Sequence, residues 1–135
     1  MRNVEIRRSE RERIMSLLYQ AEILNLPIKE VLDRSEVPET DFVTQRLVGV
    51  ALHIEDIDTT CSKNLNNWEL ERLPTLDRSI LRLAVYELLY ASDVTPAVAI
   101  SEAVELAKTF STEDSGRFIN GVLAEVQRGI EAPTQ

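Results

Sequence analysis

The spacing of apolar residues is the feature that most limits what this chain can fold into. Apolar side chains recur every three or four residues, as on one face of an α-helix, and no stretch alternates apolar and polar residues as a β-strand does. In residues 76–92 they cover more than half of the helical circumference, which is typical of a helix surrounded by others. The sequence therefore predicts an all-α fold.

Breaks in the pattern divide the chain into about seven helices with short connections. Leu26-Pro27 ends the first helix, Thr95-Pro96 caps and opens another, and Ser111–Asp114 has the spacing of a capping box. The predicted helices are 9–24, 28–34, 43–65 with an interruption near 58–60, 76–92, 96–109 and a last one ending near 130. We expect one domain, 1–135, in which residues 1–8 and 131–135 are flexible ends.

The rarity of reactive residues excludes several kinds of chemistry. Cys61 is the only cysteine and His53 the only histidine, so one chain can form no internal disulfide, cysteine metal site or His-Cys pair. We expect Cys61 to be a small buried residue and His53 to have a structural or surface role. No acid/base carboxylate pair, glycine-rich phosphate loop or nucleophile with its base is present. The sequence therefore predicts a protein that is not an enzyme and holds no metal or cofactor.

Targeting signals are also missing from the pattern. No apolar run approaches the roughly 18 residues of a membrane helix, and no apolar segment follows the N-terminal arginines as in a signal peptide. We therefore expect a cytoplasmic protein with no membrane partner.

Charge is unevenly distributed along the chain. Residues 1–20 hold five arginines against three glutamates, a net of +2, so the rest carries −10 of the total of −8. Such an acidic body repels phosphate, which excludes nucleic-acid binding by a generally basic surface. A local basic site remains compatible with this charge if a second, basic partner assists it.

The arginines of the first predicted helix form part of one stripe. At about 100° per residue, Arg8, Arg11 and Tyr19 lie beside the face that Ile14 and its apolar neighbours bury. Arg7 is adjacent to the stripe. Arginine binds phosphate through its planar fork, and tyrosine stacks on unpaired bases. The stripe is compatible with an anion site, and equally with a solvated charged face.

Four further residues stand out from the helical pattern. Glu87 interrupts an apolar helix, where we expect it to pair with an arginine or cap a neighbouring helix. Trp68 lies in a polar turn and is expected to plug the edge of the core, with ligand binding as the alternative. Phe118 lies beside the apolar stripe of the last helix, on its flank or on a binding surface. Gly121 lies opposite that stripe, which suggests a close approach to its backbone.

Three segments carry a resemblance to a known family. "RRSERERIMSLLYQAE" (7–22), "LDRSILRLAVYELL" (76–89) and "VTPAVAISEAVELAKTFSTEDSGRFINGVL" (94–123) together resemble the NusB family of bacterial transcription antitermination factors. The match follows the family's order over nearly the whole chain. It implies a seven-helix, NusB-like bundle.

The resemblance also implies a function. In that family the arginine-rich first helix binds the single-stranded boxA element of ribosomal RNA leader transcripts jointly with NusE, a basic ribosomal protein. The complex then joins RNA polymerase and other Nus factors and suppresses premature termination. Matching positions here would make the RNA-binding residues Arg7, Arg8, Arg11, Tyr19, Lys108, Asp114 and Phe118.

Two other functions remain as alternatives. The chain could be a helical adaptor that binds only protein, or a homodimeric regulator that self-associates through the apolar seam of residues 43–61. A relative of the RNA-binding module of ribosomal RNA cytosine methyltransferases was also considered. Only five residues follow Ile130, so we expect no methyltransferase domain.

Overall fold

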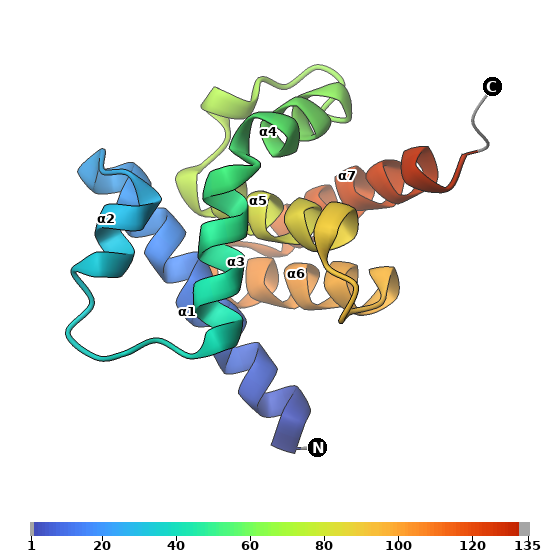
Figure 1. The fold of residues 1–135 in the computed structure, drawn as a ribbon. Coiled ribbons are helices and arrows are strands. Elements are labelled where there is room, and N and C mark those ends of the chain that lie inside the picture. Colours follow the sequence, from blue (N-terminus) through green and yellow to red (C-terminus); the bar gives the residue numbers. More distant parts are fainter. Residues whose placement is uncertain (1, 133–135) are drawn as a thin grey trace.

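The computed structural model describes residues 2–132, and in this range it contains seven α-helices, one short 3-10 helix and no strand (Figure 1). The all-α prediction is confirmed. No helix in this range is long and apolar enough to cross a membrane. The elements are α1 (Arg2–Leu24), α2 (Ile28–Asp33), α3 (Asp41–Leu52), α4 (Ile54–Lys63), η1 (Leu70–Arg72), α5 (Thr75–Tyr90), α6 (Pro96–Phe110) and α7 (Glu113–Glu131).

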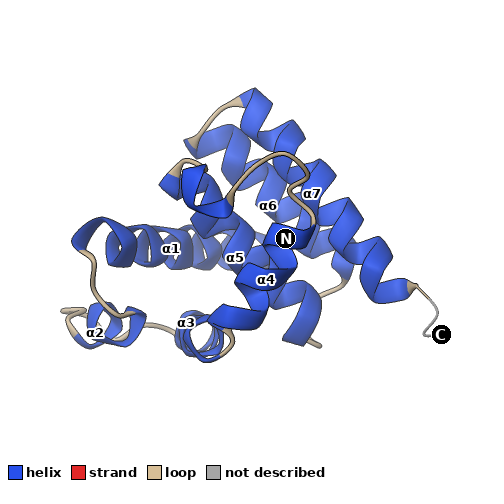
Figure 2. Cartoon of the chain, turned by 90° about the horizontal axis from the view of Figure 1, so that it is seen from above, coloured by secondary structure: helices blue, strands red, loops and turns tan. Residues whose placement is uncertain are grey.

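Helix α5 is the centre of the bundle. It packs against α1, α3, α4, α6 and α7, as its broad apolar circumference predicted. Helices α6 and α7 pack as a hairpin joined by two residues, and α2 packs on α1 and α3. Viewed from above, α2 and α3 lie together on one side of the molecule, with α6 and α7 on the other (Figure 2).

Two helix boundaries differ from the prediction. Helix α1 begins at Arg2 and not at Ser9. The sequence did not indicate these first turns, because the apolar pattern starts only at Ile14. Whether residues 1–8 and 131–135 are flexible stays a prediction, and residues 1 and 133–135 lie outside the described range.

The break in the predicted helix 43–65 lies at His53 and not at 58–60. His53 leaves the helical conformation with φ −109° and ψ 21°, and its ring stacks on Tyr90 with 3.9 Å between the ring centroids. Because apolar side chains on both sides of the break enter one core, the sequence pattern runs across it without a visible change.

The apolar seam of residues 43–61 is part of the chain's own core. Val43, Leu47, Val50, Ile57 and Cys61 are all buried among the other helices. This seam therefore cannot be the surface of a homodimer. Burial also raises the pKa of Cys61 to about 12, so its thiol stays protonated and unreactive near neutral pH, as a structural role requires.

Two helical glycines have opposite surroundings. A Cβ atom added to Gly49 would lie 2.3 Å from the ring of Tyr86, so α3 and α5 approach closely only because this side chain is absent. At Gly121 no described atom lies within 4 Å of such a Cβ. The close approach expected at Gly121 is therefore not made by the described part of the chain.

Alanine at these two positions should shift stability in opposite directions. Gly49→Ala should lower the free energy of unfolding by about 1 kcal/mol, because overpacking of about 1–3 kcal/mol exceeds the helix-propensity gain. Gly121→Ala should raise it by up to about 1 kcal/mol, since the helix gains propensity without a clash. Urea unfolding followed by circular dichroism measures both. A Gly49→Ala protein as stable as the Gly121→Ala protein would contradict the close packing of α3 on α5.

Candidate nucleic-acid interface

A buried ion cluster joins the arginine-rich helix to the core. Arg11 donates to Glu87 of α5 from Nε at 3.0 Å and from Nη2 at 2.9 Å. Arg46 of α3 donates to the same carboxylate from Nε at 3.0 Å and Nη2 at 2.8 Å. The side chains of Arg11 and Glu87 are 5% and 1% exposed. The prediction that Glu87 pairs with an arginine is confirmed, with two arginines.

Asp93, in the loop between α5 and α6, balances the charge of this cluster. It accepts from Arg46 Nη2 at 2.9 Å and from Nη1 at 3.3 Å. These hydrogen bonds hold the pKa of Asp93 below its usual range. Two guanidinium groups thus face two carboxylates, of which Glu87 is buried and Asp93 is half exposed.

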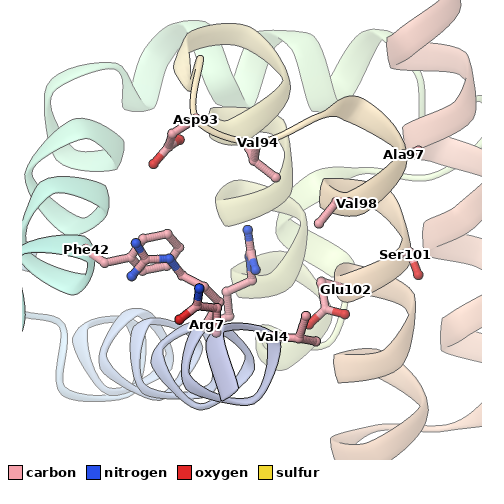
Figure 3. A pocket seen from close by; sticks show the side chains of 11 residues that line it. Val4, Arg7, Phe42, Asp93, Val94, Ala97, Val98, Ser101 and Glu102 are labelled. Atoms are coloured by element: carbon pink, nitrogen blue, oxygen red, sulfur yellow. The ribbon is translucent and has the colours of Figure 1, made fainter. Parts of the chain in front are cut away.

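Phe42, the second residue of α3, gathers the arginines around its ring. The guanidinium carbons of Arg46 and Arg7 lie 3.7 Å and 4.2 Å from the ring centroid, within cation–π distance. Figure 3 shows Arg7 beside this ring. Arg7 also donates to Glu10 at 2.7 Å, and Glu10 accepts a hydrogen bond from Thr40, which caps α3. The half-exposed Arg7 side chain is therefore held in one place at the junction of α1 and α3.

Arg8 lies at the surface, on the side of α1 that faces α6. Its Nε and Nη2 donate to the two oxygens of Glu102 at 3.1 Å and 2.8 Å. The Arg8 side chain is 49% exposed, whereas that of Glu102 is only 10% exposed. The hydrogen bonds from Arg8 lower the pKa of Glu102, so this carboxylate stays ionised near neutral pH. Arg8 keeps an open face toward solvent.

A hollow of about 400 Å³ separates the start of α1 from the start of α6 (Figure 3). Val4, Val94 and Val98 form much of its apolar wall, and Arg7, Arg11, Asp93 and Glu102 supply its charges. The hollow therefore lies between the Arg11–Glu87–Arg46 cluster and Glu102, the partner of Arg8.

Tyr19 lies farther along α1, at a second hollow of about 450 Å³. Ser9, Glu12 and Ser16 line it from α1, with Leu76 from the start of α5 and Phe110 from the end of α6. Tyr19 and Phe110 are both exposed aromatic side chains, 40% and 44% accessible. Tyr19 therefore shares this hollow with a second exposed aromatic residue, Phe110, which the sequence did not indicate.

The three predicted site residues in α6 and α7 lie around the turn between these helices. Lys108 lies across Gly116, whose missing side chain leaves room for its aliphatic stem. Asp114 is exposed and pairs with Arg117. Phe118 is partly buried against the core. Ser115 ties this turn to α5 by donating to the buried Asp77 at 2.9 Å.

The predicted stripe is therefore only partly at the surface. Arg8 and Tyr19 are exposed, as the helical geometry predicted, but Arg11 points into the core because Glu87 and Arg46 lie beneath it. Trp68 is 60% exposed, so the prediction that it plugs the core edge is wrong. Sequence reasoning missed Phe42 and Arg46, which come from a distant helix whose packing on α1 no local spacing reveals.

In the described residues no group of three or more histidine, cysteine, aspartate or glutamate side chains could hold a metal ion. The chemistry available at these surfaces is the binding of anions and of flat aromatic groups.

Comparisons with known proteins give a consistent result. A family model described as the NusB family matches residues 8–128. The transcription antitermination protein NusB of Salinispora arenicola (strain CNS-205) is 40% identical over 127 residues, covering 89% of this chain and 93% of that protein. The protein of the same name from Bacillus subtilis (strain 168) is 39% identical over 127 residues, covering 93% and 97%.

Solved structures agree with this match. NusB of T. maritima has a TM-score of 0.82 at 34% identity and covers 90% of each chain. A chain in a crystal structure of the antitermination factors NusB and NusE in complex with double-stranded RNA has a TM-score of 0.77 at 26% identity, covering 91% of this chain and 96% of that one.

The buried cluster should control stability. Glu87→Gln should lower the free energy of unfolding by about 3–5 kcal/mol, because Arg11 is left as a buried, unpaired cation. Glu30→Gln is the matched control, since Glu30 pairs with Arg34 at the surface and such pairs contribute less than about 1 kcal/mol. Chemical denaturation of both variants provides the measurement. Equal losses in the two proteins would show that the cluster is not the constraint described here.

Proposed function

The chain belongs to the NusB family of transcription antitermination proteins, and on that premise we propose that it binds the boxA element of ribosomal RNA leader transcripts together with NusE. In this proposal the complex joins RNA polymerase and other Nus factors in the cytoplasm and suppresses premature termination. The protein acts as a binding subunit and carries out no catalysis.

The observation that carries the proposal is the exposed face of α1. Arg8 and Tyr19 are 11 residues apart, about three helical turns, and so lie on one side of the helix. The rise between them is about 16 Å, roughly the span of a few nucleotides. A half-exposed guanidinium group and an exposed phenol ring at this separation can hold a phosphate and stack on a base of the same strand.

The remaining site residues extend this surface. Arg7 and Lys108 supply charge to the phosphate backbone, and Phe118 offers a second aromatic group for stacking. Asp114 can accept a hydrogen bond from the amino group of a base. Arg11 acts indirectly in this proposal: its buried pair with Glu87 positions α1 and thereby Arg7 and Arg8.

The charge of the chain explains the need for a partner. Arg7 and Arg8 already share their charge with Glu10 and Glu102, so a phosphate must compete with a carboxylate for each guanidinium group. The body of the protein is also acidic. RNA binding by this chain alone is therefore weak, and a basic partner such as NusE docks on the acidic surface and completes the RNA site.

Single-stranded RNA is the proposed form of the ligand. Tyr19 and Phe118 can stack only on bases that are not paired, because the faces of paired bases are covered by their neighbours. The related NusB–NusE structure contains double-stranded RNA. Competition between single-stranded boxA RNA and the same sequence in a duplex decides between the two forms.

A protein-only helical adaptor is the second candidate, and one observation favours it: every proposed contact arginine of α1 is already engaged by a carboxylate. An adaptor would bind NusE as well without RNA as with it. Its binding to NusE would also be unchanged by the loss of Arg8.

Replacing Arg8 by alanine should weaken RNA binding. We expect the dissociation constant for single-stranded boxA RNA, measured by fluorescence anisotropy with NusE present, to rise about tenfold, because a charge-assisted hydrogen bond is lost. The slope of the logarithm of the binding constant against the logarithm of the salt concentration should become shallower by about 0.7. Arg34→Ala removes the same charge from α2 and serves as the control. Unchanged RNA affinity of the Arg8→Ala protein would favour the adaptor.

Replacing Glu102 should have the opposite effect. Glu102→Gln removes the carboxylate that holds Arg8, so boxA affinity should rise by about three- to tenfold as phosphate no longer competes with it. Glu105→Gln is the matched control, since Glu105 is exposed one turn along α6 and makes no hydrogen bond to Arg8. Equal gains in both variants would mean that overall charge, and not the release of Arg8, sets the affinity.

A further inference from the structure

We propose that Trp68 is a further base-stacking residue, which extends the RNA surface beyond the seven residues named above. This inference rests on the proposed RNA-binding function and adds to it the surface formed by Trp68 together with Phe118. The ligand is an unpaired base of single-stranded RNA.

The indole of Trp68 is accessible to a ligand. Its side chain is 60% exposed although an indole is among the largest apolar groups that a core can bury. The surrounding loop is well anchored, because Leu65 and Leu70 on either side of it are buried. The backbone N–H of Trp68 donates to the Leu65 carbonyl at 3.1 Å, and Asn66 takes the left-handed conformation with φ 52°. The loop thus holds the indole outward in a defined position.

Phe118 supports the indole from α7. The two rings meet edge to face, with 6.3 Å between centroids and an interplanar angle of 74°. Phe118 itself packs against the core. The pair is therefore a fixed aromatic platform with an open side, the arrangement on which single-stranded nucleic acids stack in a sequence-tolerant manner.

Charges beside the platform suit a phosphate backbone. Arg72 pairs with Glu69 at 3.3 Å and Arg117 pairs with Asp114, and both arginines are at least 71% exposed. Each pair is neutral and at the surface, so its guanidinium group can exchange a carboxylate for a phosphate at little cost.

The platform is also connected to the rest of the proposed surface. Phe118 follows Asp114 by one turn of α7. Ser115 in the same turn bonds to Asp77 at the start of α5, next to Leu76, which lines the hollow with Tyr19 and Phe110. A single RNA strand can therefore run from α1 past the α6–α7 turn to Trp68.

Trp68 is the only tryptophan, so its emission reports directly on this site. Unlabelled single-stranded boxA RNA is titrated into the full chain, with and without NusE, while tryptophan emission is recorded. Anisotropy of dye-labelled RNA is measured in parallel. We expect emission to be quenched along the same binding curve as the anisotropy. The Trp68→Phe protein supplies the background signal of NusE and should retain most of the affinity.

The Trp68→Ala protein should bind RNA about tenfold more weakly than the wild type. Leu52→Ala, which trims an exposed apolar side chain on α3, is the control and should bind normally. If RNA binds by anisotropy while emission and the Trp68→Ala affinity stay unchanged, this inference is overturned and the proposed function stands. Emission that responds to NusE but not to RNA would overturn it in favour of a protein contact. If no RNA binds even with NusE, the proposed function is wrong, and the role of Trp68, which rests on it, is wrong as well.

Discussion

The shared carboxylate of Glu87 is the constraint on which the arrangement of the bundle depends. It accepts four hydrogen bonds from the guanidinium groups of Arg11 and Arg46, and so joins α1 and α3 to the central helix α5. Such a cluster adds little stability compared with well-packed apolar residues. It does restrict geometry, because a shift of α1 along α5 would leave buried charges unpaired. The direction in which α1 presents its outer face follows from this.

The arginines of α1 differ in how deeply they are buried. Arg11 is committed to the core, Arg7 lies across Phe42 at the junction with α3, and Arg8 remains half exposed. The outer arginines are each paired with a carboxylate of the same chain, Arg7 with Glu10 and Arg8 with Glu102. In the proposed RNA site, phosphate competes with these carboxylates, and the proposed role of a partner is to shift that competition.

Three aromatic side chains are exposed on the surface near these arginines or the α6–α7 turn. Tyr19, Phe110 and Trp68 come from three different segments and remain accessible although the core is otherwise well filled with aliphatic residues. Stacking on such rings adds affinity without adding positive charge. For a chain with a net charge of −8, the proposed stacking contacts are compatible with an otherwise acidic protein, because they need no further positive charge.

The sequence by itself determined the all-α fold, the centrality of residues 76–92, the burial of Cys61, and the family. These follow from local periodicity, from composition and from residues adjacent in the chain. It did not reveal the break at His53, because one core receives the apolar side chains on both sides of it. Only the tertiary structure decided that Arg11 is buried while Arg8 is exposed, and that Trp68 stands outside the core. Helical angles state on which side of α1 a residue lies. They do not state what lies against that side, because the partner of Arg11 is Glu87, 76 residues away in the chain.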